Sequence, residues 1–114
     1  MKVEVKVLLR NQVMLPATAM CRVEIRDVSL LDAPSITVCS HLLSVADKTG
    51  ITVVTDLLEV PSNYPAGRHL NVWAHLSISG SERIQSGDFI TVQAFPVKTD
   101  SPYTEIVVEL QLIQ

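Results

Sequence analysis

A strand pattern and a turn pattern meet in the stretch Val23-Glu24-Ile25-Arg26-Asp27-Val28-Ser29-Leu30-Leu31-Asp32-Ala33-Pro34. In its first half, apolar and polar residues alternate, which is typical of a strand with one buried face. In its second half, Asp27, Ser29 and Asp32 can accept hydrogen bonds from nearby backbone N–H groups, and Pro34 removes a backbone donor. We therefore expect a strand that runs into a polar corner, after which a second strand begins.

The same plan of strand and corner recurs along the chain. Apolar alternation and β-branched residues predict strands at 2–9, 20–28, 35–43, 51–60, 70–78, 88–95 and 105–114. A short pairing segment around Ile84 would make an eighth strand, and 41–46 is also compatible with a single helical turn. A turn is predicted at 47–50. Because no 3.6-residue period is sustained, we expect an all-β fold, a seven- or eight-stranded antiparallel β-sandwich.

Length and composition bound the class of protein. The 114 residues predict a single domain, 1–114. With 9 Lys and Arg against 12 Asp and Glu and no basic run, nucleic acid is not an expected partner. The chain is 47% hydrophobic and only 18% charged, which indicates either a well-filled interior or an apolar surface used for binding or oligomerisation.

No apolar stretch reaches the length of about 18 residues that a membrane-spanning helix needs. Met1 to Leu9 alternate charged residues and valine, unlike the apolar region of a signal peptide. We therefore expect either an intracellular protein or one whose leader has been removed. Membrane attachment is expected only if a lipidated leader existed.

Residue types that carry chemistry are scattered. His41, His69 and His75 stand in no pattern that a metal site requires. Asp27 and Asp32 resemble a carboxylate pair, but in a corner we expect them to accept hydrogen bonds from the backbone. We therefore expect no catalytic residues, no metal ligands and no cofactor, and we predict that the protein is not an enzyme.

The two cysteines are expected to be free thiols. Cys21 has the parity of the inward-facing Val23 and Ile25, whereas the parity of Cys39 relative to its neighbours predicts the opposite face. A disulfide needs close approach of the two Cβ atoms, so this mismatch disfavours one, although pairing in an oxidising compartment is the alternative.

Trp73 is the residue that most suggests binding. It has the outward parity of strand 70–78, together with Asn71 and His75, and we expect His75 to lie on the surface. A loop or a neighbouring strand covers the indole, or Trp73 anchors a partner, since tryptophan concentrates binding energy at interfaces. Val107, outward on the last strand, is a weaker signal of the same kind. Asn71, Trp73, His75 and Val107 are therefore the candidate partner contacts.

Several short motifs occur in a familiar order. They are Leu15-Pro16, the corner Asp27-Val28-Ser29 with Asp32-Ala33-Pro34, and Phe95-Pro96-Val97 with Thr99. From about Val3 to Leu112 the chain thereby resembles the small β-sandwich lipoproteins of the YbaY and YscW type, which include type III secretion pilotins. The resemblance implies that the Asp27-to-Pro34 motif is a structural corner.

The resemblance also implies a non-enzymatic function. In the pilotin members, the sandwich binds an unfolded or helical tail of a secretin and escorts it to the outer membrane. Members usually carry a signal peptide and a lipidated cysteine, which implies a periplasmic or outer-membrane location, although no lipobox precedes a cysteine in this sequence.

Our leading hypothesis is a binding module that recognises a protein or peptide at the cell envelope, through an apolar cleft or an open strand edge. The alternative is a soluble intracellular protein of unknown role that forms a homo-oligomer through a sheet edge. The last strand is then the natural candidate for the edge.

Overall fold

The computed structural model describes residues 1–9, 14–30, 32–46 and 52–114, and this part of the chain forms seven strands. They are β1 (Lys2–Leu9), β2 (Met20–Asp27), β3 (Ile36–Ser44), β4 (Thr52–Glu59), β5 (Leu70–Ser77), β6 (Phe89–Ile90) and β7 (Tyr103–Leu112). The described residues contain no helix capable of crossing a membrane. The predicted all-β fold with seven strands is confirmed. The predicted turn at 47–50 lies outside the described residues.

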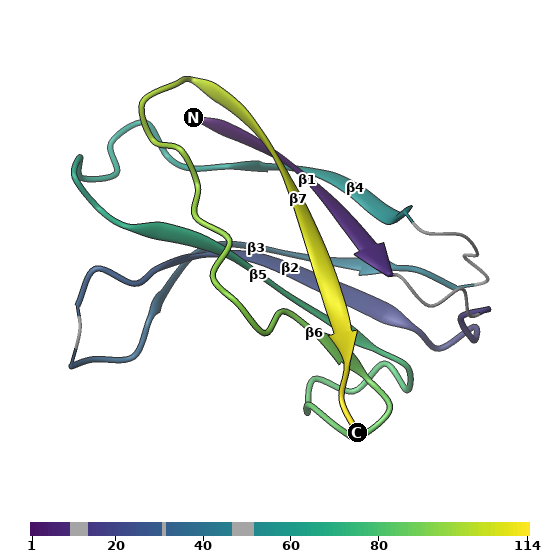
Figure 1. Ribbon diagram of the computed structural model, residues 1–114. Coiled ribbons are helices and arrows are strands. Elements are labelled where there is room, and N and C mark those ends of the chain that lie inside the picture. Colours follow the sequence, from purple (N-terminus) through teal and green to yellow (C-terminus); the bar gives the residue numbers. More distant parts are fainter. Residues whose placement is uncertain (10–13, 31, 47–51) are drawn as a thin grey trace.

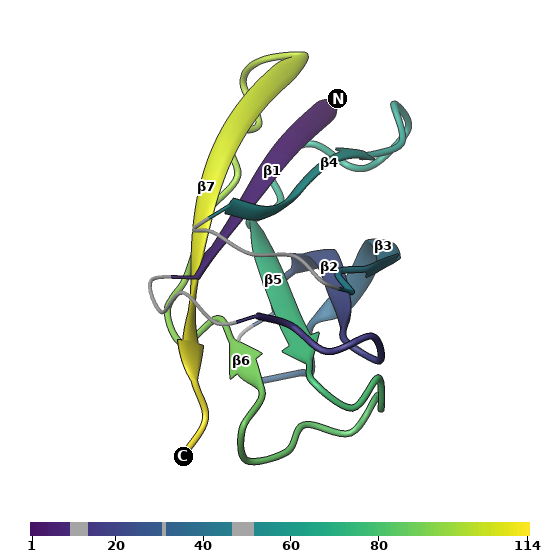
Figure 2. The same cartoon turned by 90° about the vertical axis from the view of Figure 1, so that its right-hand side faces the viewer.

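All seven strands belong to one sheet, in the order β3-β2-β5-β6-β7-β1-β4. The sheet folds back on itself into two layers, with β7, β1 and β4 in one layer and β5, β2 and β3 in the other (Figures 1 and 2). The two end strands approach each other, and His41 Nδ1 on β3 lies 2.7 Å from Asp56 Oδ2 on β4. The sandwich is therefore almost closed into a barrel.

One strand pair differs from the expected antiparallel arrangement. β1 and β7 run parallel, with Lys2 opposite Tyr103 and Leu9 opposite Leu110. The other neighbouring pairs among the described strands are antiparallel. Because β1 and β7 come from opposite ends of the chain, no hairpin turn fixes their relative direction.

The sixth strand is much shorter than the predicted 88–95. Only Phe89 and Ile90 pair with both β5 and β7. Beyond Ile90 the chain stays bound to β5 alone: the Thr91 N–H donates to the Ala74 carbonyl at 3.1 Å, and Phe95 accepts from the Val72 N–H at 2.9 Å. The sheet therefore splits after β6, and β7 diverges from β5 (Figure 1).

Two local alternatives are settled. Ile84 lies outside the strands and is exposed, so it does not form an eighth strand. β3 continues to Ser44, so 41–46 does not form a helical turn.

The core lies between the two layers and follows the predicted alternation. Val3, Val5 and Val7 of β1 are fully buried, and so are the inward residues of β2 and β5. These inward residues are Cys21, Val23 and Ile25 on β2, and Val72, Ala74 and Leu76 on β5.

The predicted orientation of Cys39 is wrong. Cys39 lies opposite the buried Ile25 and packs against the core, whereas Ile36 is exposed. The cause is a shift in register between Ile25 and Arg26, where β3 carries an extra residue that reverses its alternation. Cys21 lies opposite Leu43 rather than Cys39, and both thiols are free.

Candidate partner-binding surfaces

The corner after β2 is held by the carboxylate of Asp27, which is buried. Its Oδ1 accepts a hydrogen bond from the Ser29 N–H at 3.0 Å. Its Oδ2 accepts one from the Tyr64 hydroxyl, and Arg68 Nη1 lies 3.2 Å away. Hydrogen bonds from Ser29 and Tyr64, together with the charge of Arg68, lower the pKa of Asp27 to about 2. The first residue of the corner thus ties β2 to the loop that precedes β5.

The rest of the corner divides into a bound part and an exposed part. The Val28 N–H donates to the His69 carbonyl at 2.8 Å, and Ser29 Oγ accepts from the His69 N–H at 2.8 Å. Asp32, Ala33 and Pro34 are exposed. The motif is therefore joined to the fold through its first three residues, and none of these contacts requires a ligand.

His75 is not a surface residue, contrary to the prediction. It is only 3% exposed, and its Nε2 lies 2.9 Å from Asp88 Oδ2. Asp88 also accepts hydrogen bonds from the N–H groups of Ile78 and Gln85. Burial opposes ionisation of Asp88, but these three partners together hold its pKa below the usual value. The loop after β5 therefore covers most of His75 on the outer face of the strand.

Trp73 remains half-buried on the outer face of β5. The guanidinium of Arg26, from the neighbouring β2, lies 3.8 Å from the centre of the indole ring. Arg26 Nε is held in turn by Glu24 Oε1 at 2.9 Å, and Glu24 Oε2 accepts from Ser40 Oγ at 3.0 Å. A neighbouring strand therefore covers one face of the indole, which is one of the two expected arrangements.

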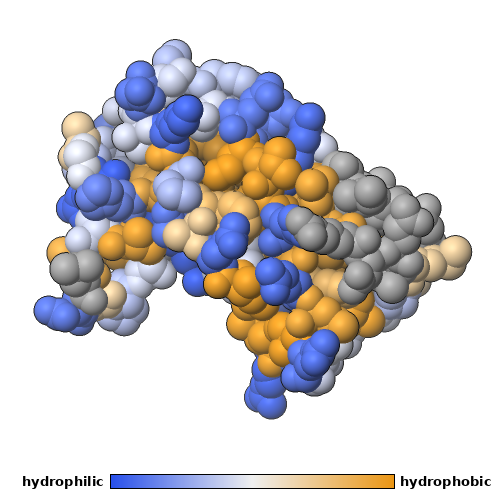
Figure 3. Space-filling view, viewed as in Figure 1, coloured by the Kyte–Doolittle hydropathy of each residue, from blue (hydrophilic) through white to orange (hydrophobic). Residues whose placement is uncertain are grey.

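The uncovered part of Trp73 lines a cleft. Asn71 lies beside it, and the volume of the cleft is about 350 Å³. One wall comes from the corner after β2, and the other comes from the segment 91–94, which we call the bridging segment. Figure 3 shows the surface hollowed between these two walls. The structure thus brings Asn71 and Trp73 together at one opening.

Val107 lies on a different surface. It is 53% exposed on β7, where it is opposite Lys6 of β1. Trp73 and Val107 therefore do not form one contact site, because the bridging segment and the split in the sheet lie between β5 and β7.

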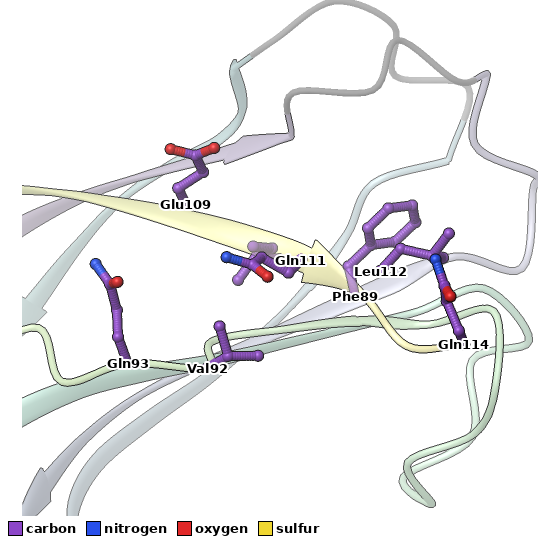
Figure 4. A pocket seen from close by; sticks show the side chains of 8 residues that line it. Phe89, Val92, Gln93, Glu109, Gln111, Leu112 and Gln114 are labelled. Carbon is purple, nitrogen blue, oxygen red and sulfur yellow. The ribbon is translucent and has the colours of Figure 1, made fainter.

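A second, larger cleft opens where the sheet splits, and its volume is about 550 Å³. It is lined by Phe89, Val92, Gln93, Glu109, Leu110, Gln111, Leu112 and Gln114. Phe89 and Leu112 lie together at the closed end, whereas Gln93 and Glu109 lie where the bridging segment and β7 have separated (Figure 4). Hydrophobic side chains gather on this face near the ends of β6 and β7 (Figure 3). Val92 and Gln93 line both clefts.

Sequence reasoning missed Arg26 and the bridging segment. Arg26 contacts Trp73 because β2 pairs with β5, and no local sequence pattern predicts which strands pair. The bridging segment was predicted as part of a regular strand. Pro96 was a signal that regular pairing ends nearby, because proline cannot donate to a ladder.

Possible metal ligands and thiol groups can be followed through the described part of the chain. In the described ranges, no three or more His, Cys, Asp and Glu side chains are grouped so as to hold a metal ion. Burial, with a smaller effect of the Asp56 carboxylate, raises the pKa of the Cys21 thiol to about 12. Cys21 is therefore protonated at neutral pH and is not a nucleophile there.

A nearly closed all-β sandwich with two surface clefts defines the structural class, and comparison with known proteins defines the family. Residues 1–110 match the family model described as type III secretion system lipoprotein chaperone (YscW). The chain belongs to this family, which is a family of chaperones and not a class of enzymes. No curated protein sequence matches the chain.

A solved structure has the same fold. It is described as an alternative pilotin from the type II secretion system of Vibrio cholerae, and it is 23% identical to this chain. The alignment covers 97% of this chain and 96% of the pilotin, with a TM-score of 0.74. The family model confirms the expected resemblance to YscW-type proteins, and the solved structure shares the fold over nearly its whole length.

Proposed function

We propose that this chain is a non-enzymatic binding module that holds a protein component of a bacterial secretion system at the cell envelope. The family match over residues 1–110 carries this proposal, because the family is described as one of secretion chaperones. The partner that best fits the pilotin resemblance is the C-terminal tail of a secretin.

The Trp73 cleft is the contact surface that we propose for this partner. It contains an aromatic side chain that is half-buried and has the guanidinium of Arg26 over one face, beside the polar side chain of Asn71. Such partly covered aromatic side chains supply much of the binding energy in protein interfaces. Val107 adds a second point of contact on the β7 side of the bridging segment.

The test uses the C-terminal region of the secretin produced by the same cell. Trp73 is the sole tryptophan of the chain, so its fluorescence reports this cleft alone. We expect binding to change its emission, and we expect Trp73→Ala to weaken binding by about 30-fold, or about 2 kcal/mol. Leu42→Ala is the matched control, because Leu42 is an exposed apolar residue on β3, away from the cleft.

The possible results separate the two parts of the proposal. Equal binding by wild type and Trp73→Ala, with unchanged emission, would move the contact away from Trp73. No binding of the secretin region by the wild-type chain would refute the proposed partner.

A further inference from the structure

On the open side of β7, the backbone hydrogen-bonding groups of Glu105 and Val107 meet no partner among the residues that the structure describes. Along a strand, the N–H and C=O groups of successive residues point to opposite edges. The Pro102 carbonyl accepts from the Lys2 N–H, so the backbone N–H and C=O groups of the even-numbered residues of β7 point toward β1. The Ile113 N–H donates to the Asp88 carbonyl, so the odd-numbered residues face β6 and the split in the sheet.

At the two ends of this edge, the backbone groups of β7 have partners within the chain. At one end, Gln111 pairs with Ile90 of β6. At the other, Ser101 Oγ donates to the Tyr103 carbonyl at 2.8 Å and lies 3.4 Å from the Tyr103 N–H. Between them lie Glu105 and Val107, whose outward-pointing backbone groups meet no partner in the described part of the chain.

The opposite side of the opening is the bridging segment. The Thr91 N–H at its start and the Phe95 carbonyl just beyond its end form hydrogen bonds with β5. No backbone hydrogen bond joins it to β7 among the residues that the structure describes. The cleft of about 550 Å³ lies where they begin to separate and is lined on β7 by residues 109–112, so Val107 and Glu105 follow beyond it along the strand. The sheet therefore has the outline of a gap for one more strand.

We propose that an extended segment of a partner protein enters this gap and pairs with the edge of β7 at Glu105 and Val107. An unpaired sheet edge is matched by another strand, which supplies a carbonyl and an N–H at every second residue. Every second side chain of the segment would point inward, as Ile106 and Val108 do on β7. The segment recognised is thus one in which apolar and polar residues alternate.

A single extended segment suits the gap better than a second copy of the chain. A second copy would bring its own bridging segment alongside its own β7, so its edge is not presented as a free strand. This inference deepens the proposed function, because it says that the partner is bound as an extended strand. It rests on the proposed function only for the identity of the partner.

Amide hydrogen exchange in the wild-type chain tests the proposal. Two probes are used: overlapping peptides from the C-terminal region of the secretin, and a synthetic peptide of alternating valine and threonine with lysines at its ends. In the free protein, we expect rapid exchange at Glu105 and Val107 and slow exchange at Ile106 and Val108. A bound probe should slow exchange at Glu105 and Val107 by about tenfold or more.

A variant pair tests the backbone pairing separately. Val107→Pro removes an N–H that points to the open edge and leaves the ladder with β1 intact, a place where strands tolerate proline. We expect it to weaken probe binding by about tenfold. Val107→Ala keeps the N–H and should bind within about threefold of wild type. If Val107→Pro does not fold, exchange in the wild-type chain decides alone.

Each other result has a definite meaning. Secretin peptides that bind as helices, or bind while exchange at Glu105 and Val107 stays fast, overturn the strand proposal and leave the proposed function standing. Protection of these amides by the valine–threonine peptide alone supports the strand site and refutes the secretin as partner. No protection by either probe overturns the inference, and so does slow exchange in the free protein accompanied by a dimeric mass.

Discussion

Asp27 shows how one carboxylate joins two distant parts of the chain. It ends β2, and its oxygens are shared by Ser29, Tyr64 and Arg68, two of which come from the loop before β5. These partners stabilise the ionised carboxylate, so the pKa of Asp27 falls from its ordinary value of 3.8 to about 2. The corner is therefore held together most strongly when Asp27 is charged.

The pH dependence of stability follows from this pKa. A group whose pKa is lower in the folded state stabilises the fold above its ordinary pKa, and this contribution is lost as the pH falls through the folded value. We expect the melting temperatures of wild type and Asp27→Asn to differ by a constant amount down to about pH 4, and the difference to shrink from there to about pH 2. Thermal unfolding followed by circular dichroism measures this.

Tyr64→Phe provides the control for the Asp27 prediction. Without the Tyr64 hydroxyl, the pKa of Asp27 moves back toward its ordinary value, so the loss of stability should be smaller and should be complete at a higher pH than in the wild type. If the difference in melting temperature between wild type and Asp27→Asn persists unchanged to about pH 2, the stabilising effect of Asp27 does not depend on its charge.

At the scale of the elements, alternation along a strand separates buried from exposed positions. On β4, Leu58 is fully buried and the adjacent Leu57 is 47% exposed. The two residues have the same chemistry and the same strand, and they differ only in the face of the sheet on which they lie. They form a matched pair for testing the packing of the two layers.

Leu58→Ala should lower the free energy of unfolding by about 2–5 kcal/mol, since it removes buried methyl groups and leaves a cavity. Leu57→Ala should change it by no more than about 0.5 kcal/mol. Urea unfolding of the two variants measures both values. Equal losses would mean that β4 does not pack on the opposite layer with the face that carries Leu58.

At the scale of the whole molecule, the bent sheet leaves little edge for self-association. β3 and β4 end the strand order, but they approach each other, and His41 and Asp56 link them. β7, the strand predicted to provide an edge, lies inside the order between β6 and β1 and is open only along part of one side. The fold thus favours the binding of a segment over pairing between whole copies.

We expect a single-chain mass of 12.5 kDa in light scattering, even at high protein concentration. His41→Ala should leave this mass unchanged, because an ion pair at a partly exposed site contributes only about 0–1 kcal/mol. A concentration-dependent dimer would instead revive the alternative of a homo-oligomer joined through a sheet edge.

The local sequence pattern placed most of the strands, because alternation is a property that one buried face imposes on neighbouring residues. Its predicted β1 matches the structure residue for residue, and its order of motifs led to the YscW family. It also singled out Asn71 and Trp73, which line one cleft, although their role in binding remains a proposal.

The way in which the strands meet was not predictable from the local pattern. The parallel pairing of β1 with β7, the burial of His75 by Asp88, the inward orientation of Cys39 and the split after β6 all depend on residues far apart in the chain or on a shift of register. Such contacts leave no periodic trace, because alternation tells which face a residue prefers and not which strand lies beside it. The open edge of β7 is therefore visible in the fold alone.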